Sequence, residues 1–324
     1  MIITKTPLRI SFFGGGSDIP QFYEENEGMV LSTTINSYIY LAVNRCVASH
    51  LRVIYSILEQ TESVDDIKHD RVRQTLKYFE IPSNIEIASF SDVPTKGTGL
   101  GSSSTFTVGL VNALYRICHG KNIDPHELAE LASYIEINRC EEPIGKQDQY
   151  AAAYGGFNVI HFHNSHAKVK HLEVDPSVVY ELNNNLLCFN TGVSRQASSV
   201  LKQQVENLKQ QSTIERTKTM VELAKNAVKL LQKKKVDDFG YLLDQSWQIK
   251  KQLSDNISTS HIDEMYERAT KNGALGGKIL GAGGGGYLLV YVPEKNKNRL
   301  LESMKQYERF NFKFCKQGST LEVV

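Results

Sequence analysis

A short run of glycine and serine in the first third of the chain has the composition of an anion-binding loop. Residues 97–104 read GTGLGSSS and lead directly into a segment with apolar residues at helical spacing. Successive glycines expose backbone N–H groups, and the positive end of the helix dipole lies where the next helix begins. Both features favour phosphate, while the serine hydroxyls can cap the helix, donate to phosphate oxygens or coordinate Mg²⁺. We therefore expect a phosphate-binding loop here in preference to a plain capped turn.

Two further glycine clusters occur at residues 14–16 and 281–286. No cluster is followed by the Lys-Ser or Lys-Thr pair that a P-loop requires, so that class of nucleotide site is excluded. The G-x-G-x-x-G spacing within 281–286 precedes an expected strand at 287–292 instead of following one. We interpret this match to a dinucleotide-binding pattern as accidental. Both clusters predict either close backbone approach or flexible turns.

An acidic segment, YIEINRCEEPIGKQDQYAAAYGG, covers residues 134–156. Glu136 falls late on an expected helix, and Asp148 follows an expected turn at 143–145. Phosphoryl transfer to a hydroxyl needs one carboxylate that accepts or orients the proton and another group that holds a metal. Asp148 could equally be a helix N-cap, so the residues alone leave both interpretations open.

Composition limits the class of partner. A chain of 324 residues favours two domains with a cleft that holds a small ligand. Its 37 Lys+Arg and 36 Asp+Glu give a net charge of +1, which supplies no field for nucleic acid or an anionic membrane. The five cysteines have no C-x-x-C spacing, which disfavours a zinc site and a disulfide framework. Without an apolar leader or membrane-length segment, we expect a cytoplasmic protein.

Hydrophobic patterning predicts strands and helices mixed through both halves of the chain. Strands are expected at residues 2–12, 29–35, 38–43, 156–162, 168–174, 185–190, 287–292 and 310–314. Helices are expected at residues 106–117, 125–139 and 295–307 and in several amphipathic segments of 195–272. Because the two do not alternate regularly, the predicted class is α+β. A break at Asp175-Pro176 places the predicted domains at 1–180 and 181–324.

The three glycine clusters, in this order, resemble those of the GHMP kinases, a superfamily that includes galactokinase, homoserine kinase and mevalonate kinase. The three matching segments are TPLRISFFGGGSD, PTKGTGLGSSS and KILGAGGGGYLLV, and the resemblance spans nearly the whole chain. It implies a first domain like ribosomal protein S5 domain 2, a ferredoxin-like second domain, and ATP and Mg²⁺ as cofactors.

The resemblance also implies roles for individual residues. Asp148 is the catalytic base, and Arg9 is a fixed positive charge that stabilises its carboxylate and the moving phosphoryl group. Ser103 and Glu136 hold Mg²⁺, with Glu141 and Glu142 as alternatives to Glu136. The residues implied to bind the ATP phosphates are Lys96, Gly97, Thr98, Gly99, Gly101, Ser102, Ser103 and Ser104.

Within the superfamily, RISFFGGGSD, GTGLGSSSTFTVGLVNAL and GKQDQYAAAYGGFN resemble most the D-glycero-D-manno-heptose 7-phosphate kinases. This implies phosphorylation of the C1 hydroxyl to give a 1,7-bisphosphate. The implied substrate-binding residues are Gly15, Gly16, Ser17, Asp18, Lys146, Arg195, Gly283 and Gly284. Lys146 and Arg195 are the two candidates for binding the phosphate that the substrate already carries.

Two other functions remain open at this point. One is a kinase of an unphosphorylated sugar such as L-fucose, and the other is a catalytically silent ligand-binding regulator with the kinase fold. RNA binding is disfavoured by the even charge balance. The sequence leaves a homodimer open.

Overall fold

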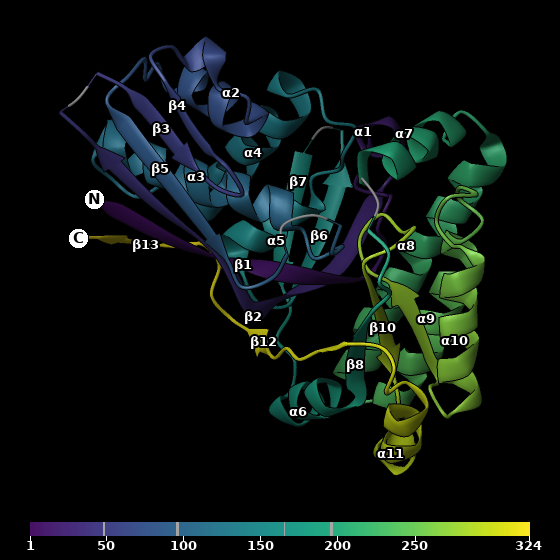
Figure 1. The fold of residues 1–324 in the computed structure, drawn as a ribbon. Helices are drawn as coiled ribbons and strands as arrows, with labels where there is room; N and C mark the ends of the chain where they lie inside the picture. The colour runs from purple at the N-terminus through teal and green to yellow at the C-terminus, as the bar shows by residue number, and fades with distance from the viewer. Residues whose placement is uncertain (48, 95–96, 165, 195–196) are drawn as a thin grey trace.

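The computed structural model has two β-sheets with helices packed on both, which is the α+β class expected (Figure 1). It describes residues 1–47, 49–94, 97–164, 166–194 and 197–324. Within these residues the first sheet has nine strands, in the order β13-β1-β2-β5-β3-β4, with β12 and β6 paired to β2 and β7 paired to β6. The second has four strands in the order β11-β8-β10-β9.

The first sheet is organised by two long strands, β1 (Ile2–Phe13) and β2 (Gly28–Arg45). The two strands expected at 29–35 and 38–43 are one continuous strand. The β1–β2 ladder shifts register between Pro7 and Arg9 and again between Ser11 and Phe13. Such irregularities bend a strand and re-aim its side chains, and here they lie on both sides of Arg9.

Shorter strands complete the first sheet. They are β3 (Leu51–Ile54), β4 (Leu58–Thr61), β5 (Ile85–Ser91), β6 (Asn158–His163), β7 (His166–His171), β12 (Phe314–Cys315) and β13 (Thr320–Val323). The sheet is covered by α2 (Asp70–Tyr78), α3 (Ser102–His119), α4 (Pro125–Tyr134) and α5 (Gln147–Tyr154). The helix expected at 125–139 is confirmed, although its last turn, Ile135–Arg139, is π-helical. Two short elements, α1 (Pro20–Tyr23) and η1 (Val64–Asp66), lie in the connections.

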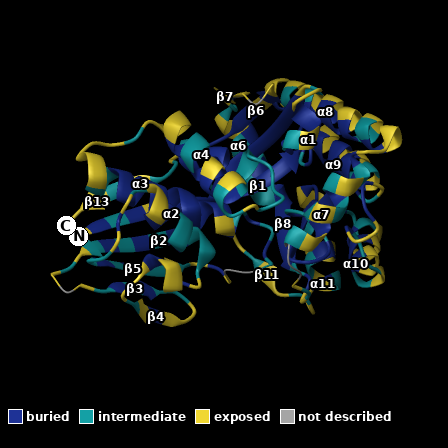
Figure 2. Ribbon diagram, turned by 90° about the horizontal axis from the view of Figure 1, so that it is seen from above, coloured by how far each residue is buried: buried dark blue, intermediate teal, exposed yellow. Residues whose placement is uncertain are grey.

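The second sheet contains β8 (Leu186–Asn190), β9 (Gly276–Ile279), β10 (Tyr287–Tyr291) and β11 (Arg309–Phe310). The helices around it are α6 (Pro176–Asn185), α7 (Ala197–Asn207), α8 (Gln211–Gln232), α9 (Val236–Lys250), α10 (Ser260–Lys271) and α11 (Glu294–Ser303). Figure 2 shows that α7 to α10 are striped by exposure, as expected for amphipathic helices that bury one face. No helix in the described part of the chain is long and apolar enough to cross a bilayer.

The predicted division into residues 1–180 and 181–324 differs from the observed topology at the boundary between the domains and at the end of the chain. The boundary between residues 180 and 181 falls inside α6, which begins after the Asp175-Pro176 break. The end of the chain does not stay in the second domain, because β12 pairs with β2 and β13 pairs with β1. The two termini therefore meet, and the Met1 amino group donates to the Val324 carbonyl oxygen at 2.9 Å (Figure 1).

Aromatic side chains join the two sheets into one core. Phe12 and Phe13, at the end of β1, pack edge-on against Phe239 of α9 with ring centroids 5.4 and 5.1 Å apart. All three rings are fully buried. Since large buried aromatics fix the geometry of the elements that carry them, α9 is held against the end of β1.

Candidate active site

A cavity of about 420 Å³ lies where the end of β1, the N-terminus of α3, the N-terminus of α5 and the second domain meet. This size suits a small ligand. The described residues that line it include Arg9, Ser11, Gly15, Gly16, Asp18, Arg71, Gly97, Thr98, Gly99, Gly101, Ser102, Ser103, Ser104, Glu142, Gln147, Asp148, Ser194, Ser198, Gln204, Lys250, Lys278 and Gly281.

The predicted phosphate loop forms one wall of the cavity and leads into α3. Gly97, Gly99 and Gly101 have φ angles of 71°, 74° and 80°, a backbone region that side chains disfavour. A Cβ on Gly99 would lie 2.3 Å from the Leu280 carbonyl oxygen, so the third glycine cluster packs directly on this loop. The open N–H groups at the start of α3 and the helix dipole give this wall a positive potential.

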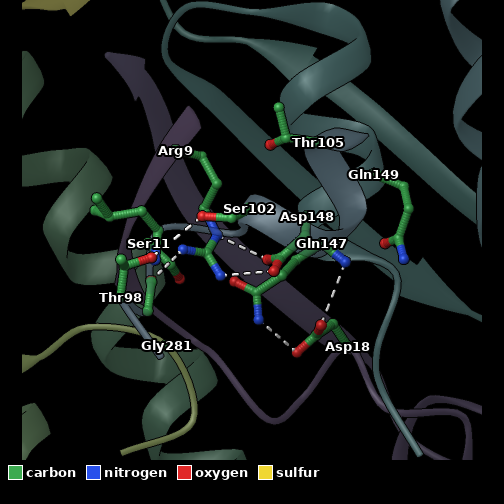
Figure 3. Close-up of polar contacts among 12 residues, drawn as sticks. Arg9, Ser11, Asp18, Thr98, Ser102, Thr105, Gln147, Asp148, Gln149 and Gly281 are labelled. Carbon is green, nitrogen blue, oxygen red and sulfur yellow. Dashed lines mark hydrogen bonds and ion pairs between the residues drawn. The ribbon is translucent and has the colours of Figure 1, made fainter. Parts of the chain in front are cut away.

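Arg9 and Asp148 both line the cavity and make a bidentate pair (Figure 3). Arg9 Nε and Nη2 each donate to one oxygen of Asp148 at 2.7 Å. Arg9 Nη1 donates to the Gly99 carbonyl oxygen at 2.6 Å, and its backbone N–H donates to Leu100. Arg9 therefore joins the carboxylate to the phosphate loop in a fixed geometry.

Asp18 is held by the residue next to Asp148. Its carboxylate accepts from the Gln147 backbone N–H at 3.2 Å, the Gln147 side-chain amide at 3.0 Å and the Gly16 N–H at 2.9 Å (Figure 3). Burial raises the pKa of Asp18, and the backbone N–H donors oppose that rise. Asp18 and Asp148 thus lie on one side of the cavity, where a hydroxylated ligand would meet both.

The two glutamates considered as metal ligands occupy different environments. Glu136 is fully buried and accepts from Arg71 Nε at 2.7 Å and from the Gln149 side chain. It is absent from the described lining residues, whereas Glu142 and Ser103 are among them. Arg71 connects the two carboxylates, since its Nη2 also donates to Glu142 at 3.1 Å. The geometry therefore presents Glu142, the alternative, to the cavity and not Glu136.

The oxygen donors present are compatible with a magnesium ion. The described residues contain no cluster of three or more His, Cys, Asp or Glu that could hold a metal by themselves. Mg²⁺ commonly takes one or two protein oxygens and completes its octahedron with water and substrate phosphates, so one carboxylate and one serine hydroxyl in the cavity lining are sufficient.

Several predicted substrate residues lie elsewhere. Ser17 is fully buried and its hydroxyl donates to the Gly14 carbonyl oxygen at 2.7 Å, which stabilises the turn. Gly283 and Gly284 pack against Ile257, and the Gly284 N–H donates to the Ile257 carbonyl oxygen at 2.8 Å. These three residues are not among the described lining residues, while Gly15, Gly16 and Asp18 do line the cavity.

The structure describes only one of the two residues proposed to bind a substrate phosphate. The Lys146 ammonium group donates to Glu130 Oε2 at 2.9 Å, and Lys146 is not among the described lining residues. Arg195, together with Lys96 of the phosphate-binding set, lies outside the residues that the structure describes.

Sequence reasoning missed Lys250, a buried lysine at the end of α9. Its Nζ donates to the carbonyl oxygens of Gly281 and Ile279. Burial, followed by the positive charge of Arg9, lowers the pKa of Lys250 to about 8. A signal was available, because Phe239, Leu243, Trp247 and Lys250 recur at helical spacing and place Lys250 on the apolar face.

A second missed lysine, Lys278, extends from β9 toward β1. Its Nζ donates to the carbonyl oxygens of Ser11 at 2.8 Å and Phe12 at 2.9 Å. Burial, and then the charges of Lys250 and Arg9, lower the pKa of Lys278 well below its usual range. The lysine occurs in GGKI, a short fully buried strand that the sequence analysis did not identify.

Comparison with known proteins identifies the family. Residues 69–156 match the GHMP kinases N-terminal domain and residues 227–309 match the GHMP kinases C-terminal domain, together more than half of the chain. This chain belongs to the GHMP kinase family. The first match contains the phosphate loop, Glu142 and Asp148, and the second contains Lys250 and the third glycine cluster.

Two relatives of this GHMP kinase are sugar kinases by name, and another, from Methanothermobacter thermautotrophicus, is named mevalonate kinase. D-glycero-alpha-D-manno-heptose 7-phosphate kinase from Campylobacter jejuni is 29% identical, over 98% of this chain and 97% of that protein. Bifunctional fucokinase/GDP-fucose pyrophosphorylase from Arabidopsis thaliana is 26% identical over 95% of this chain, which spans 32% of that longer protein.

A solved structure shows the same fold. The D-glycero-D-manno-heptose 1-phosphate kinase from Bacteriodes thetaiotaomicron superposes with a TM-score of 0.82 at 24% identity, covering 100% of this GHMP kinase and 99% of that chain. The two-domain GHMP kinase architecture expected from the sequence is thereby confirmed.

Proposed function

We propose that this GHMP kinase transfers the γ-phosphoryl group of ATP to a sugar phosphate, D-glycero-D-manno-heptose 7-phosphate, at its C1 hydroxyl. The product is the 1,7-bisphosphate together with ADP. The observation that carries the proposal is the Arg9–Asp148 pair, held against the phosphate loop inside one cavity. A carboxylate for the acceptor proton and an anion cradle for the donor are the two parts that phosphoryl transfer requires.

Asp148 is the base in this proposal. Each of its oxygens accepts one hydrogen bond from Arg9 and retains a lone pair for the acceptor hydroxyl. As the hydroxyl oxygen attacks the γ-phosphorus, its proton passes to Asp148, and the bond from that phosphorus to the β,γ-bridging oxygen breaks. Arg9 keeps the carboxylate oriented and lies beside the charge that develops on the phosphoryl group.

The donor side is the loop from Gly97 to Ser104. Its backbone N–H groups and the α3 N-terminus would bind the ATP phosphates, with Ser103 and Glu142 as the protein oxygens that would hold Mg²⁺. When bound, Mg²⁺ supplies charge neutralisation for the phosphates. The bond from Arg71 to Glu142 restrains that carboxylate in its cavity-facing position.

Support for the heptose phosphate comes from the Campylobacter jejuni relative, whose alignment covers almost the full length of both chains. The polar groups around Asp18 and Gln147 suit an acceptor with several hydroxyls. L-fucose is the second candidate acceptor, because the Arabidopsis thaliana relative is a fucokinase by name over nearly all of this chain.

A panel of acceptors tests the proposal. ADP release would be measured with ATP, Mg²⁺ and, in turn, D-glycero-D-manno-heptose 7-phosphate, free D-glycero-D-manno-heptose and L-fucose. We expect the highest kcat/KM with the heptose 7-phosphate. A higher kcat/KM with L-fucose would transfer the assignment to a fucokinase, and no turnover with any sugar despite ATP binding would indicate a silent regulator.

A further inference from the structure

Lys250 and Lys278 are two buried lysine side chains that the proposed reaction leaves without a role. They are 5% and 2% exposed, and both line the cavity that contains Asp148. They reach it from different elements, since Lys250 ends α9 and Lys278 lies on β9. A buried lysine is uncommon unless it is paired with an opposite charge.

Neither lysine has a carboxylate partner among the described ion pairs, because both are held only by backbone carbonyl oxygens. Asp18 is the acidic group whose charge acts on Lys250, and Arg9, the other nearby cation, is already paired with Asp148. An ammonium group has three donors, and two carbonyl contacts leave one N–H of each lysine available to a ligand. The missing partner is therefore an anion that enters the cavity.

Ser11 provides an independent indication of where that anion lies. Its hydroxyl is buried in the cavity wall and has no hydrogen-bond partner among the described residues, although its carbonyl oxygen accepts from Lys278. A Cβ on Gly15 would lie 3.8 Å from this hydroxyl and 3.5 Å from the Gln147 side-chain amide. The hydroxyl therefore lies beside the first glycine cluster and beside Gln147, whose side chain binds Asp18 on the side of the cavity proposed for the acceptor.

We propose that Lys250, Lys278 and the Ser11 hydroxyl form a site for the phosphate group that the acceptor already carries. This inference rests on the proposed function, in which the acceptor is a sugar phosphate. A bound phosphate dianion opposes the lowering of the pKa of both lysines by burial, because it favours their protonated forms, and it accepts from the serine hydroxyl. The site is an alternative to Lys146 and Arg195 as the source of selectivity for a phosphorylated sugar.

Two acceptors that differ only in the phosphate provide the first test. Lys250→Met removes the charge but keeps an unbranched side chain, and Lys251→Met is a matched control, because Lys251 is the next residue and pairs with Asp263 at 3.3 Å. We expect Lys250→Met to lower kcat/KM for the heptose 7-phosphate about 10- to 100-fold, the value of a charged hydrogen bond. With free heptose the loss caused by Lys250→Met should be much smaller, and Lys251→Met should match the wild type with both acceptors.

An equal loss on both acceptors, together with a raised KM for ATP, would assign the lysines to the nucleotide and overturn the inference. Ser11→Ala leaves the lysines and the fold in place, so it serves as a second variant. It should show a smaller loss of the same kind, limited to the phosphorylated acceptor.

A binding measurement separates failure of this inference from failure of the proposed function. Inorganic phosphate would be titrated calorimetrically into the wild-type enzyme saturated with AMPPNP, whose phosphates fill the loop. We expect phosphate binding that Lys250→Met abolishes and Lys251→Met retains, whether or not any sugar is turned over. Absence of binding to the wild type, or equal binding to Lys250→Met, would overturn the site directly.

Discussion

Arg9 is the residue on which the geometry of the site depends most. It holds Asp148 with two hydrogen bonds, contacts the phosphate loop with a third, and lies between two register shifts of its strand. Three other ionisable side chains, those of Asp148, Asp18 and Lys250, line the same cavity as Arg9. In such a site the charge of each group depends on its neighbours and on bound ligand.

Asp148→Asn should reduce kcat about 10²- to 10⁴-fold, the usual contribution of a positioned general base. The amide keeps the size of the side chain but cannot take the acceptor proton. Steady-state ADP release would give kcat, and fluorescence titration with a labelled ATP analogue would give the nucleotide affinity, which we expect to be retained. Substantial residual kcat with normal folding would exclude Asp148 as the base.

The lowered pKa of Lys250, about 8, predicts a pH dependence for the sugar phosphate. Below pH 8 Lys250 is mostly protonated before the ligand binds. Above pH 8 Lys250 must take up a proton when the phosphate binds, so the affinity for the sugar phosphate falls as the pH rises. The charged and titratable groups that act on Lys250 are Arg9, Asp18 and Lys278.

We expect the KM for the heptose 7-phosphate to increase from pH 7 to 9.5, with the slope steepening near pH 8. The substrate phosphate is a dianion over this range and does not itself titrate. In Lys250→Met the steepening near pH 8 should disappear. An unchanged profile in that variant would show that another group titrates.

At the scale of elements, the sequence predicted the parts of the site that use short, local chemistry. The loop at 97–104, the helix after it and the long first strand were all recognisable, because glycine, serine and apolar spacing act within a few residues. The distinction between Glu136 and Glu142 was not recognisable, since it depends on Arg71, which α2 brings from more than sixty positions earlier in the chain.

The close contact between the phosphate loop and the third glycine cluster predicts the effect of Gly99→Ala. Gly99 has a φ of 74° and almost touches the Leu280 carbonyl oxygen, so a methyl group adds both backbone strain and a clash. Gly120→Ala is the matched control, because Gly120 has a φ of 69° with nothing within 4 Å of the added Cβ.

We expect Gly120→Ala to cost about 1 kcal/mol of unfolding free energy, the strain of a left-handed residue, and to leave the KM for ATP unchanged. Gly99→Ala should cost more and should raise that KM, because the loop must move. Urea denaturation and initial-rate kinetics on both variants measure the two effects. A wild-type KM for ATP in Gly99→Ala would show that this loop does not bind the nucleotide.

At the scale of the whole molecule, local patterns could not predict which strands pair. The segment expected at 310–314 was assigned to the second domain, yet only its first part joins that sheet, and β12 and β13 return to the first. Strand partners are set by packing over the whole fold, and β13 is short and mostly exposed, so it carries little apolar signal. Lys278 was missed for a related reason, because its site exists only after β9 docks beside β1.

Removal of residues 320–324 tests how far the first sheet depends on the end of the chain. The deletion removes the pairing of β13 with Ile2–Lys5, and β1 becomes an exposed edge. We expect the free energy of unfolding in urea to fall by about 2–4 kcal/mol, on the basis of about 1 kcal/mol for each lost backbone hydrogen bond. Deletion of Val324 alone is the control and should cost less, because it removes only the two hydrogen bonds with Met1 and keeps the β13 pairing. Equal stability of the two truncations would contradict the prediction.

The return of the last strands to the first sheet has a consequence for biosynthesis. During translation the phosphate loop, Asp148 and most of the first sheet emerge from the ribosome before β12 and β13, which pair with β2 and β1. The N-terminal edge of β1 is therefore unpaired until residues 320–323 have been synthesised, and an unpaired strand edge is one at which nascent chains can associate.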